Sequence, residues 1–193
     1  MVTPSPPRSQ PSGTPAEHFQ NAMRLWATGV AVVTTDGPDG PHGITVNSLL
    51  SVSLAPPTLL ISLKRGSRTQ RILVEHTDGF TVNVLAGEQR SLADRFTGCR
   101  AMGESQFAGL EHRMSAHGGG PELEDSLAAL TCRTTERIDV ADHTLIIASV
   151  TDVRLPAETR THSPLIYTGR RYHTLPGSRS QPNDGRAPVP ARP

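Results

Sequence analysis

Basic and hydroxyl side chains lie close together in residues 63–73, LKRGSRTQRIL. The pattern predicts a strand that ends, a turn at a glycine and a helix that begins after Ser67, a residue type favoured as a helix N-cap. Free backbone N–H groups and the helix dipole make such a helix start attractive to anions. The segment therefore predicts a phosphate site, and a capped surface helix with solvated basic residues is the alternative. The side chains that would meet there are Ser67, Thr69, Lys64, Arg65 and Arg68.

Residues 43–54, GITVNSLLSVSL, place many polar side chains on a segment with strand character. Polar groups at the end of a barrel strand, together with its backbone groups, can surround a planar heterocycle that has several donors and acceptors. An edge strand with one solvated face is the alternative. The polar residues are Thr45, Asn47, Ser48, Ser51 and Ser53.

Asp142 and His143 lie between the two longest strand-like segments. A histidine beside a carboxylate can act as a general acid or base, or as a polar contact to a cofactor. A solvated turn is the alternative, since no serine or cysteine nearby in the sequence would serve as a nucleophile.

The familiar motifs for phosphate and hydrolytic chemistry are absent. No GxGxxG follows a strand and opens a helix, and the P-loop, HExxH and GxSxG patterns are missing. Cys99 and Cys132 form no CxxC motif and have no histidine at ligand spacing, so we expect no metal site and two reduced thiols. A phosphate-bearing cofactor on this chain must therefore be held in another way.

Charge and composition exclude further classes. Lys and Arg number 19 against 18 Asp and Glu, and aromatic residues make up 4%, which argues against a nucleic-acid surface. No apolar run approaches the roughly 18 residues that a membrane span needs. The first residues lack the apolar centre of a secretory signal, so we expect a cytoplasmic protein without membrane contact.

Proline marks the expected domain borders. Of 17 prolines, five lie in residues 1–16 and five in residues 176–193, among residues with little apolar surface. Such segments cannot offset the entropy of ordering, so both are expected to be disordered tails. Residues 17–175 are expected to form one domain.

The elements of that domain are mostly strands. We expect an amphipathic helix over residues 16–27 that lies on the domain, and a long excursion over residues 97–120 that serves as a lid or an oligomer contact. The absence of a βαβ rhythm favours a mainly β fold, an antiparallel barrel with short helices. Strands are expected at 30–35, 44–54, 58–63, 79–86, 127–140, 143–155 and the start of 164–175, and helices at 68–76 and 88–96.

Together these segments resemble the flavin reductase-like, FMN-binding split-barrel family, the reductase component of two-component flavin monooxygenases. The resemblance covers essentially the whole core and leaves out the two tails. The matching stretches are MRLWATGVAVVTT (23–35), GPHGITVNSLLSVSLAPPTLLISL (40–63), RGSRT (65–69), FTVNVLAGEQRSLADRF (80–96), QFAGL (106–110), ADHTLIIASV (141–150) and PLIYTGRRY (164–172).

The resemblance implies a homodimer of split β-barrels with one flavin per subunit, in a groove near the dimer interface. By position, the flavin ring and ribityl chain would contact Thr45, Val46, Asn47 and Ser48, with Ser62, Leu63 and Lys64 at the neighbouring strand end and Ser67 and Thr69 at the phosphate. The nicotinamide would be bound by Asp142, His143, Arg171 and Tyr172.

Two positions depart from the family pattern. Where the family has a Gly-Asp-His motif at the hairpin, this chain has Ala141 before Asp142 and His143, and Ala148 stands where family members commonly have glycine. Alanine at position 141 is costly if that residue needs a positive φ.

The function that the resemblance implies is hydride transfer from NADH or NADPH to FMN or FAD, with the reduced flavin supplied to a partner monooxygenase. The chemistry belongs to the cofactors, so no catalytic base is required and His143 is expected to position the nicotinamide. The alternative, motivated by Ala141 and the long excursion, is a flavin-retaining oxidase or electron-transfer protein that does not use NAD(P)H. A third hypothesis is a binding module without enzymatic activity.

Overall fold

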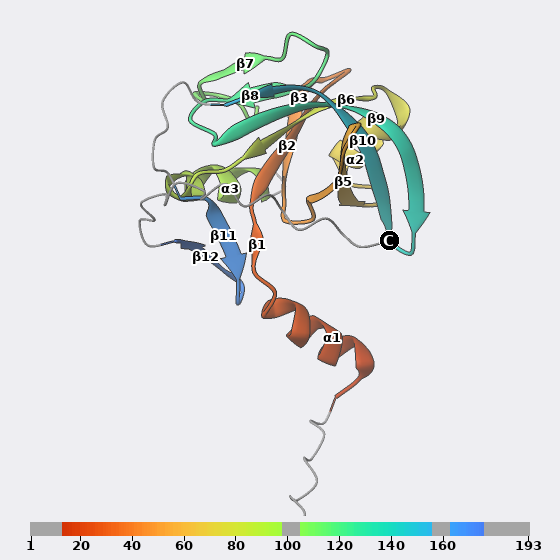
Figure 1. Cartoon of the computed structure of the whole chain (residues 1–193), viewed down its shortest axis with the longest axis vertical. Coiled ribbons are helices and arrows are strands. Elements are labelled where there is room, and N and C mark those ends of the chain that lie inside the picture. The colour runs from red at the N-terminus through yellow and green to blue at the C-terminus, as the bar shows by residue number, and fades with distance from the viewer. Residues whose placement is uncertain (1–12, 98–104, 156–162, 176–193) are drawn as a thin grey trace, which may run out of the picture.

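In a computed structural model, which describes residues 13–97, 105–155 and 163–175, the chain is built on one antiparallel sheet (Figure 1). Seven strands pair in the order β3-β2-β6-β9-β10-β5-β4. The mainly β, antiparallel fold class expected from the sequence is thereby confirmed. The strands are β2 (Ala31–Gly37), β3 (Gly40–Val46), β4 (Leu50–Leu54), β5 (Pro57–Lys64), β6 (Gly79–Val84), β9 (Ala128–Val140) and β10 (His143–Arg154).

The two edge strands of this sheet, β3 and β4, follow each other directly in the chain. Six inter-strand steps of ~4.8 Å would separate the edges of a flat sheet by roughly 29 Å. The link from Val46 to Leu50 spans at most about 14 Å. The sheet must therefore curve until its edges approach each other, and Ser48 in the link donates a hydrogen bond of 2.8 Å to the backbone oxygen of Ser62 on β5.

The prediction of a single strand over residues 44–54 is wrong. Residues 40–46 pair with β2 and residues 50–54 pair with β5, so the chain changes edge at residues 47–49. One straight strand could not serve both edges. The remaining strands of the sheet lie close to where the sequence predicted them.

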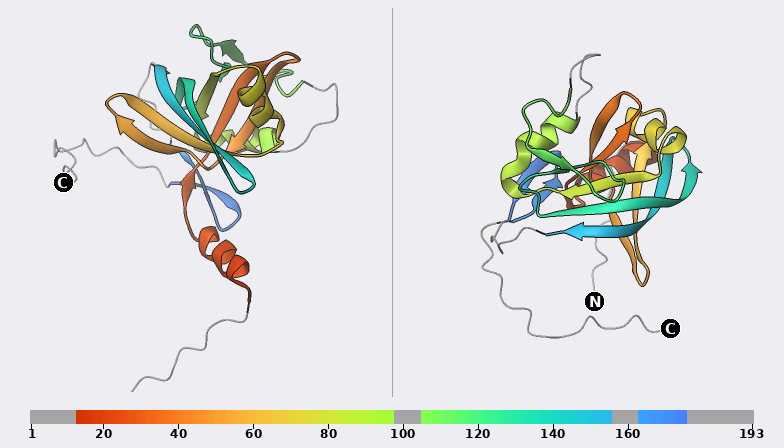
Figure 2. Two further views of the ribbon diagram at one scale, coloured as in Figure 1. Left: turned by 90° about the vertical axis from the view of Figure 1, so that its right-hand side faces the viewer. Right: turned by 90° about the horizontal axis from the view of Figure 1, so that it is seen from above.

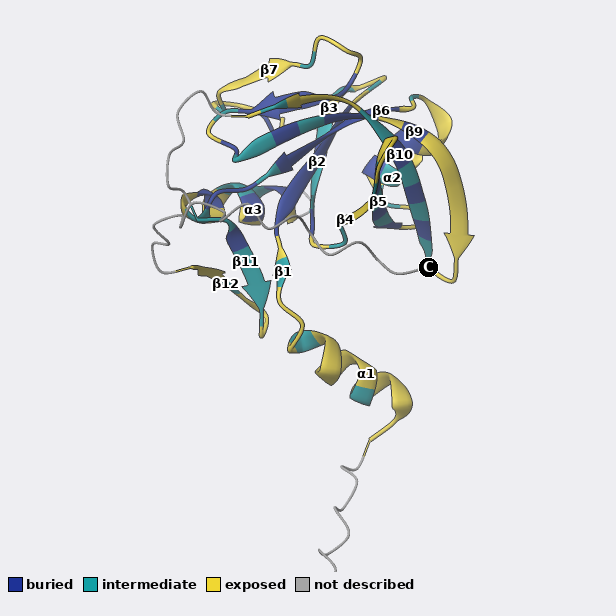
Figure 3. Cartoon of the chain, in the orientation of Figure 1, coloured by how far each residue is buried: buried dark blue, intermediate teal, exposed yellow. Residues whose placement is uncertain are grey.

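Both faces of β2 are buried, as Figure 3 shows by its dark blue ribbon. Val33 packs on one face with Ile61, Phe80 and other residues inside the curve of the sheet, while Val32 packs on the other face with Phe96. A strand covered on both sides needs a continuous apolar run, which explains the sequence VAVV.

Two helices cover the sheet. Helix α2 (Arg68–Glu75) buries Ile72 and Leu73, and α3 (Arg90–Thr97), which follows the 3-10 turn η1 (Gly87–Gln89), buries Phe96. Both were expected from the helical spacing of these residues.

Two small sheets complete the fold. One joins β1 (Thr28–Gly29), β11 (Leu165–Thr168) and β12 (Arg171–Thr174) in the order β1-β11-β12, and the other pairs β7 (His112–Met114) with β8 (Pro121–Leu123). In the described part of the chain, no helix has both the length and the hydrophobicity of a membrane span.

Helix α1 (Pro15–Arg24) projects away from the domain, so the expectation that it lies on the domain is wrong (Figures 1 and 2). It begins after Thr14, two residues ahead of the expected domain border, and none of its residues is buried. Its amphipathic pattern is real, but the apolar face has no partner among the residues that the structure describes. Phe19 and Trp26 remain 68% and 66% exposed.

The described part of the long excursion belongs to the fold. Phe107 packs on Phe96 with ring centroids 5.3 Å apart, and the Gln106 side chain accepts a hydrogen bond from the backbone N–H of Gly43. Residues 118–121 then cross the sheet in close contact with it. A Cβ atom at Gly120 would overlap the backbone of Thr34. Of the excursion, residues 98–104 lie outside the described residues, as do most residues of the two expected tails.

The close approach of residue 120 to β2 gives a direct test of this packing. Gly120→Ala should lower the free energy of unfolding by at least about 2 kcal/mol, because the methyl group would force a rigid backbone apart. Denaturant unfolding measures the loss. Gly29→Ala is the matched control, since a Cβ there meets nothing within 4 Å, and it should change stability little. Equal stability of the two variants would contradict the packing.

Candidate functional site

The strand–turn–helix predicted around Ser67 is present. Strand β5 ends at Lys64, the backbone N–H of Ser67 donates to the Lys64 oxygen at 3.1 Å, and Gly66 has a φ of 77°. The Ser67 side chain caps α2 by accepting a hydrogen bond from the N–H of Gln70 at 3.4 Å.

Unused donors remain at this helix start. In the described residues, the backbone N–H groups of Arg68 and Thr69 have no acceptor. The Thr69 side chain is fully buried and its hydroxyl has no hydrogen-bond partner. Together with the half-buried Ser67, this donor set fits an anion such as a phosphate.

The charge around the helix start is positive. Arg68 is exposed and lies 3.5 Å from Asp39. Burial, aided by the positive charge of Arg68, lowers the pKa of His42 to about 4, so His42 is neutral at pH 7. Lys64 and Arg65, which precede the helix in the chain, are also exposed.

The residues predicted to contact the flavin ring differ in burial and in the hydrogen bonds that their side chains form. The hydroxyl of Thr45 donates to the backbone oxygen of Ala93 on α3 at 2.7 Å, and Val46 is buried in the core. The Asn47 side chain is exposed. Ser48 is half-buried, and its hydroxyl is within hydrogen-bond distance of both backbone groups of Ser62.

The end of β5 lies against the β9–β10 hairpin. Leu63 is a core residue, 1% exposed, so its side chain contributes packing and not contact with a ligand. Lys64 lies opposite His143 in the ladder, and the N–H of Arg65 donates to the backbone oxygen of Asp142 at 2.9 Å. The structure thus brings the α2 start, the end of β5 and the Asp142–His143 turn together.

At the tip of that hairpin, His143 Nδ1 lies 2.9 Å from the Asp142 carboxylate. The hydrogen bond from His143, followed by its charge, lowers the pKa of Asp142. Ala141 has a φ of 52°, the left-handed region in which a Cβ is disfavoured. The departure from the family glycine therefore occurs where the backbone does require a positive φ.

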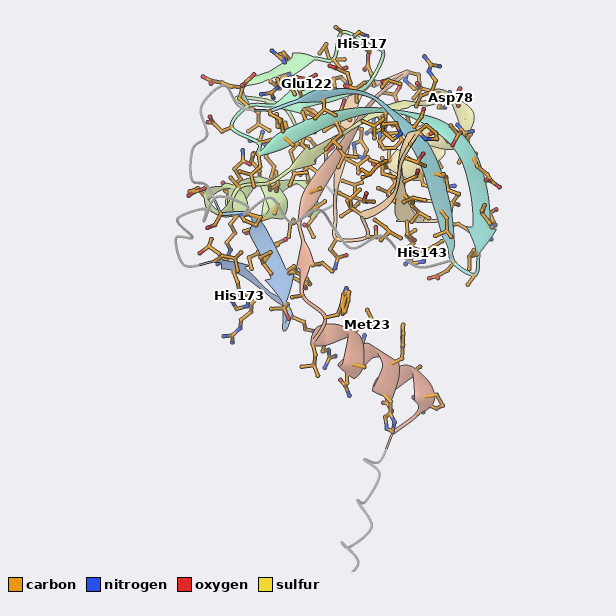
Figure 4. All side chains as sticks on the ribbon, viewed as in Figure 1. Met23, Asp78, His117, Glu122, His143 and His173 are labelled. Atoms are coloured by element: carbon orange, nitrogen blue, oxygen red, sulfur yellow. The ribbon has the colours of Figure 1, made fainter. Side chains whose placement is uncertain are left out.

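Arg171 and Tyr172 lie apart from this hairpin. They belong to β12, on the other side of the domain, as the labels of His143 and His173 in Figure 4 indicate. Tyr172 packs on Tyr167 with centroids 5.4 Å apart, and the Arg90 guanidinium lies 5.8 Å from its ring centroid. Within one chain, the four residues expected at the nicotinamide therefore form two separate pairs.

Sequence reasoning missed a hollow of about 450 Å³ between α3, β8 and the loops beside them. None of the residues expected at the flavin or the nicotinamide lines it. Its lining comes from three distant parts of the sequence, which no local pattern joins. The lining residues are Ala86, Glu88, Gln89, Ser91, Leu92, Leu110, Glu111, Leu123, Glu124 and Asp125.

This geometry describes a β-sheet protein whose unpaired donors at the α2 start suit a phosphate-bearing ligand. Residues 23–176 match the family model described as "Flavin reductase like domain". The chain belongs to the flavin reductase-like family, as its sequence resemblance indicated.

Curated relatives extend over nearly the whole chain. The FMN reductase (NADH) RutF of Methylorubrum populi is 36% identical over 178 residues, covering 92% of this chain and 84% of the relative. The flavin reductase (NADH) of Kitasatospora aureofaciens is 38% identical over 160 residues, covering 82% and 81%.

Solved structures have the same fold. The styrene monooxygenase flavin reductase SMOB from Pseudomonas putida S12 superposes with a TM-score of 0.72 at 33% identity, covering 82% of this chain and 97% of that one. The NADH:FAD oxidoreductase SgcE6 of Streptomyces globisporus C-1027 gives 0.78 at 26% identity, covering 89% and 99%.

The two alanines that depart from the family pattern should respond oppositely to glycine. Ala141→Gly should raise the free energy of unfolding by about 0.5–1 kcal/mol, because it relieves a left-handed alanine. Ala148→Gly should lower it by about 1–2 kcal/mol, since Ala148 is a fully buried strand residue. Thermal unfolding of both variants measures the difference. Destabilisation by Ala141→Gly would contradict the strain argument.

Proposed function

We propose that this chain catalyses the NADH-dependent reduction of a flavin and supplies the reduced flavin to a monooxygenase. Its NADH-dependent flavin reductase relatives support the reaction, and SMOB is the flavin reductase of styrene monooxygenase. The structural observation that carries the proposal is the α2 start, where free N–H groups meet the end of β5 and the residues after β3. The flavin would be FMN or FAD, since relatives named for each are similar to this chain.

The flavin would be held by three parts of the site. Asn47, Ser48 and the neighbouring backbone would face the ring and ribityl chain, with Thr45 and Val46 fixing the strand behind them. Ser62 and Lys64 would flank the ring from β5, where Leu63 anchors the strand in the core. Ser67, Thr69 and the free N–H groups would hold the phosphate.

When bound, a flavin accepts a hydride from the nicotinamide, so the protein has to bind and orient the two rings. Asp142 holds His143 in one orientation at the hairpin tip, which suits a positioning role. In the described residues the free thiol is Cys132, whose pKa burial raises to about 12, and it takes no part.

The proposed assembly is a homodimer. Helix α1 presents Phe19 and Met23 to solvent, Trp26 just after it is also exposed, and β4 exposes Leu50, Val52 and Leu54. Groups of exposed apolar side chains of this kind mark protein interfaces. A second copy would cover these surfaces. We further propose a cytoplasmic location, where NADH is available.

The alternative is a flavin-retaining oxidase or electron-transfer protein that does not use NAD(P)H. Ala141 favours it, because the strained residue lies next to Asp142 and His143, where the nicotinamide is expected. Flavin that stays bound through exhaustive dialysis and is reduced by neither nicotinamide under anaerobic conditions would establish this alternative.

Steady-state oxidation of NADH with FMN, FAD and riboflavin tests the reaction. We expect turnover with flavin and NADH, and its absence with all three flavins would refute the proposal.

Ser67→Gly should weaken binding of FMN by about tenfold and leave riboflavin, which lacks the phosphate, unaffected. Glycine is tolerated at an N-cap, so the helix stays intact. Equal weakening of both ligands would place the phosphate elsewhere.

The dimer is tested on α1 and on Trp26, which follows it. Met23→Glu combined with Trp26→Glu should convert a dimer to a monomer in sedimentation experiments, because two charges would have to be buried in the interface. The matched control is Gln20→Glu on the same helix, which should leave the dimer intact. A wild-type chain that sediments as a monomer would contradict the proposed assembly.

A further inference from the structure

The hollow beside α3 has an apolar floor and an acidic rim. Leu92, Leu110 and Leu123 contribute the apolar surface, and among the described residues no lysine, arginine or histidine lines the hollow. Its volume of about 450 Å³ is in the range of pockets that bind ligands or peptide segments. The acidic residues of the lining are Glu88, Glu111, Glu124 and Asp125.

Within the described residues, part of this negative charge has no ion-pair partner. The Glu124 carboxylate lies 3.9 Å from Arg154, which also binds Glu122. In the described residues, Glu111 and Asp125 form no ion pair. An occupant that combines positive charge with apolar surface would therefore complement the hollow.

The chain itself passes beside the hollow twice. The backbone N–H of Gly87 donates to the oxygen of Ser163 at 2.8 Å, and the Ser163 hydroxyl donates to the oxygen of Leu175 at 2.9 Å. Gly87 lies between Ala86 and Glu88, both of which line the hollow. Leu175, the last described residue, is therefore joined to the edge of the hollow through Ser163.

Charge distinguishes the internal segments outside the described residues from the C-terminal one. In residues 98–104 one arginine balances one glutamate, and the same holds for residues 156–162. Residues 176–193 carry three arginines against one aspartate, a formal net charge of +2 from side chains. They also contain five prolines, which restrict a free segment to extended conformations and lower the entropy lost on binding.

We propose that residues 176–193 bind in this hollow as an extended segment. Their arginines face Glu111 and Asp125, and their proline and valine side chains lie on the leucine floor. A composition too polar to fold alone is compatible with binding to a preformed surface. The proposal is independent of the proposed function, because no residue assigned to the flavin or the nicotinamide lines the hollow.

Tryptic cleavage of the full chain tests the proposal. Glu111→Gln combined with Asp125→Asn should speed cleavage after Arg179 and Arg186 by about three- to tenfold, because the bound segment loses its ion pairs. Asparagine keeps the left-handed backbone of residue 125, whose φ is 59°. Glu136→Gln, an exposed acid on β9, is the matched control and should leave the cleavage rate unchanged. Equal rates in the double variant and the wild type would overturn the proposal.

A labelled peptide of residues 176–193 gives a second measurement. It is added to full chain in which Arg179, Arg186 and Arg192 are replaced by glutamine, and fluorescence anisotropy reports binding. We expect binding at low salt that weakens as the ionic strength rises, and at least about threefold weaker binding to wild-type chain, whose own segment competes. No binding, or binding that the Glu111 and Asp125 substitutions leave unchanged, would show that another occupant fills the hollow.

Discussion

A three-residue link holds this fold in its shape. Residues 47–49 join the two edges of a seven-stranded sheet, and a link that short is incompatible with a flat sheet. Curvature follows, and with it the contact between Ser48 in the link and Ser62 on β5, the strand next to the β4 edge. The polar residues that follow β3 thereby lie beside the end of β5. Strand β5 leads directly into the start of α2. The candidate flavin site is thus a product of the same constraint that shapes the sheet.

Residues 118–123 cover part of the outer face of the curved sheet, and buried polar groups hold them in place there. The buried Asn83 side chain donates to the oxygen of Val32 and accepts from the N–H of Leu123. Thr81 donates to the oxygen of Gly120. Buried polar groups are stable only when bonded, so these contacts fix the register in which residues 118–123 cross the sheet. Gly119 and Gly120 supply the close approach.

What the sequence predicts well is encoded within a few residues. The Ser67 cap, the turn at Asp142 and the helix periods of α2 and α3 depend on neighbours along the chain, and all are present in the structure. The break after Val46 has no local signal, because no proline or glycine marks it and the cause is pairing at opposite sheet edges. The positive φ of Ala141 was equally hidden, since alanine does not indicate it. The hollow beside α3 joins residues that only the fold brings together.

Helix α1 points away from the domain, and the described part of the chain does not cover its apolar face. The oxygen of Arg24 at its end accepts hydrogen bonds from the Gly169 N–H and the Thr168 hydroxyl. β1 then pairs with β11. The apolar helix and the hairpin that carries Tyr172 are therefore one hydrogen-bonded unit. In the proposed dimer, a second copy that covers α1 would contact the same unit that positions Tyr172, and assembly would then influence one of the two pairs of residues expected at the nicotinamide.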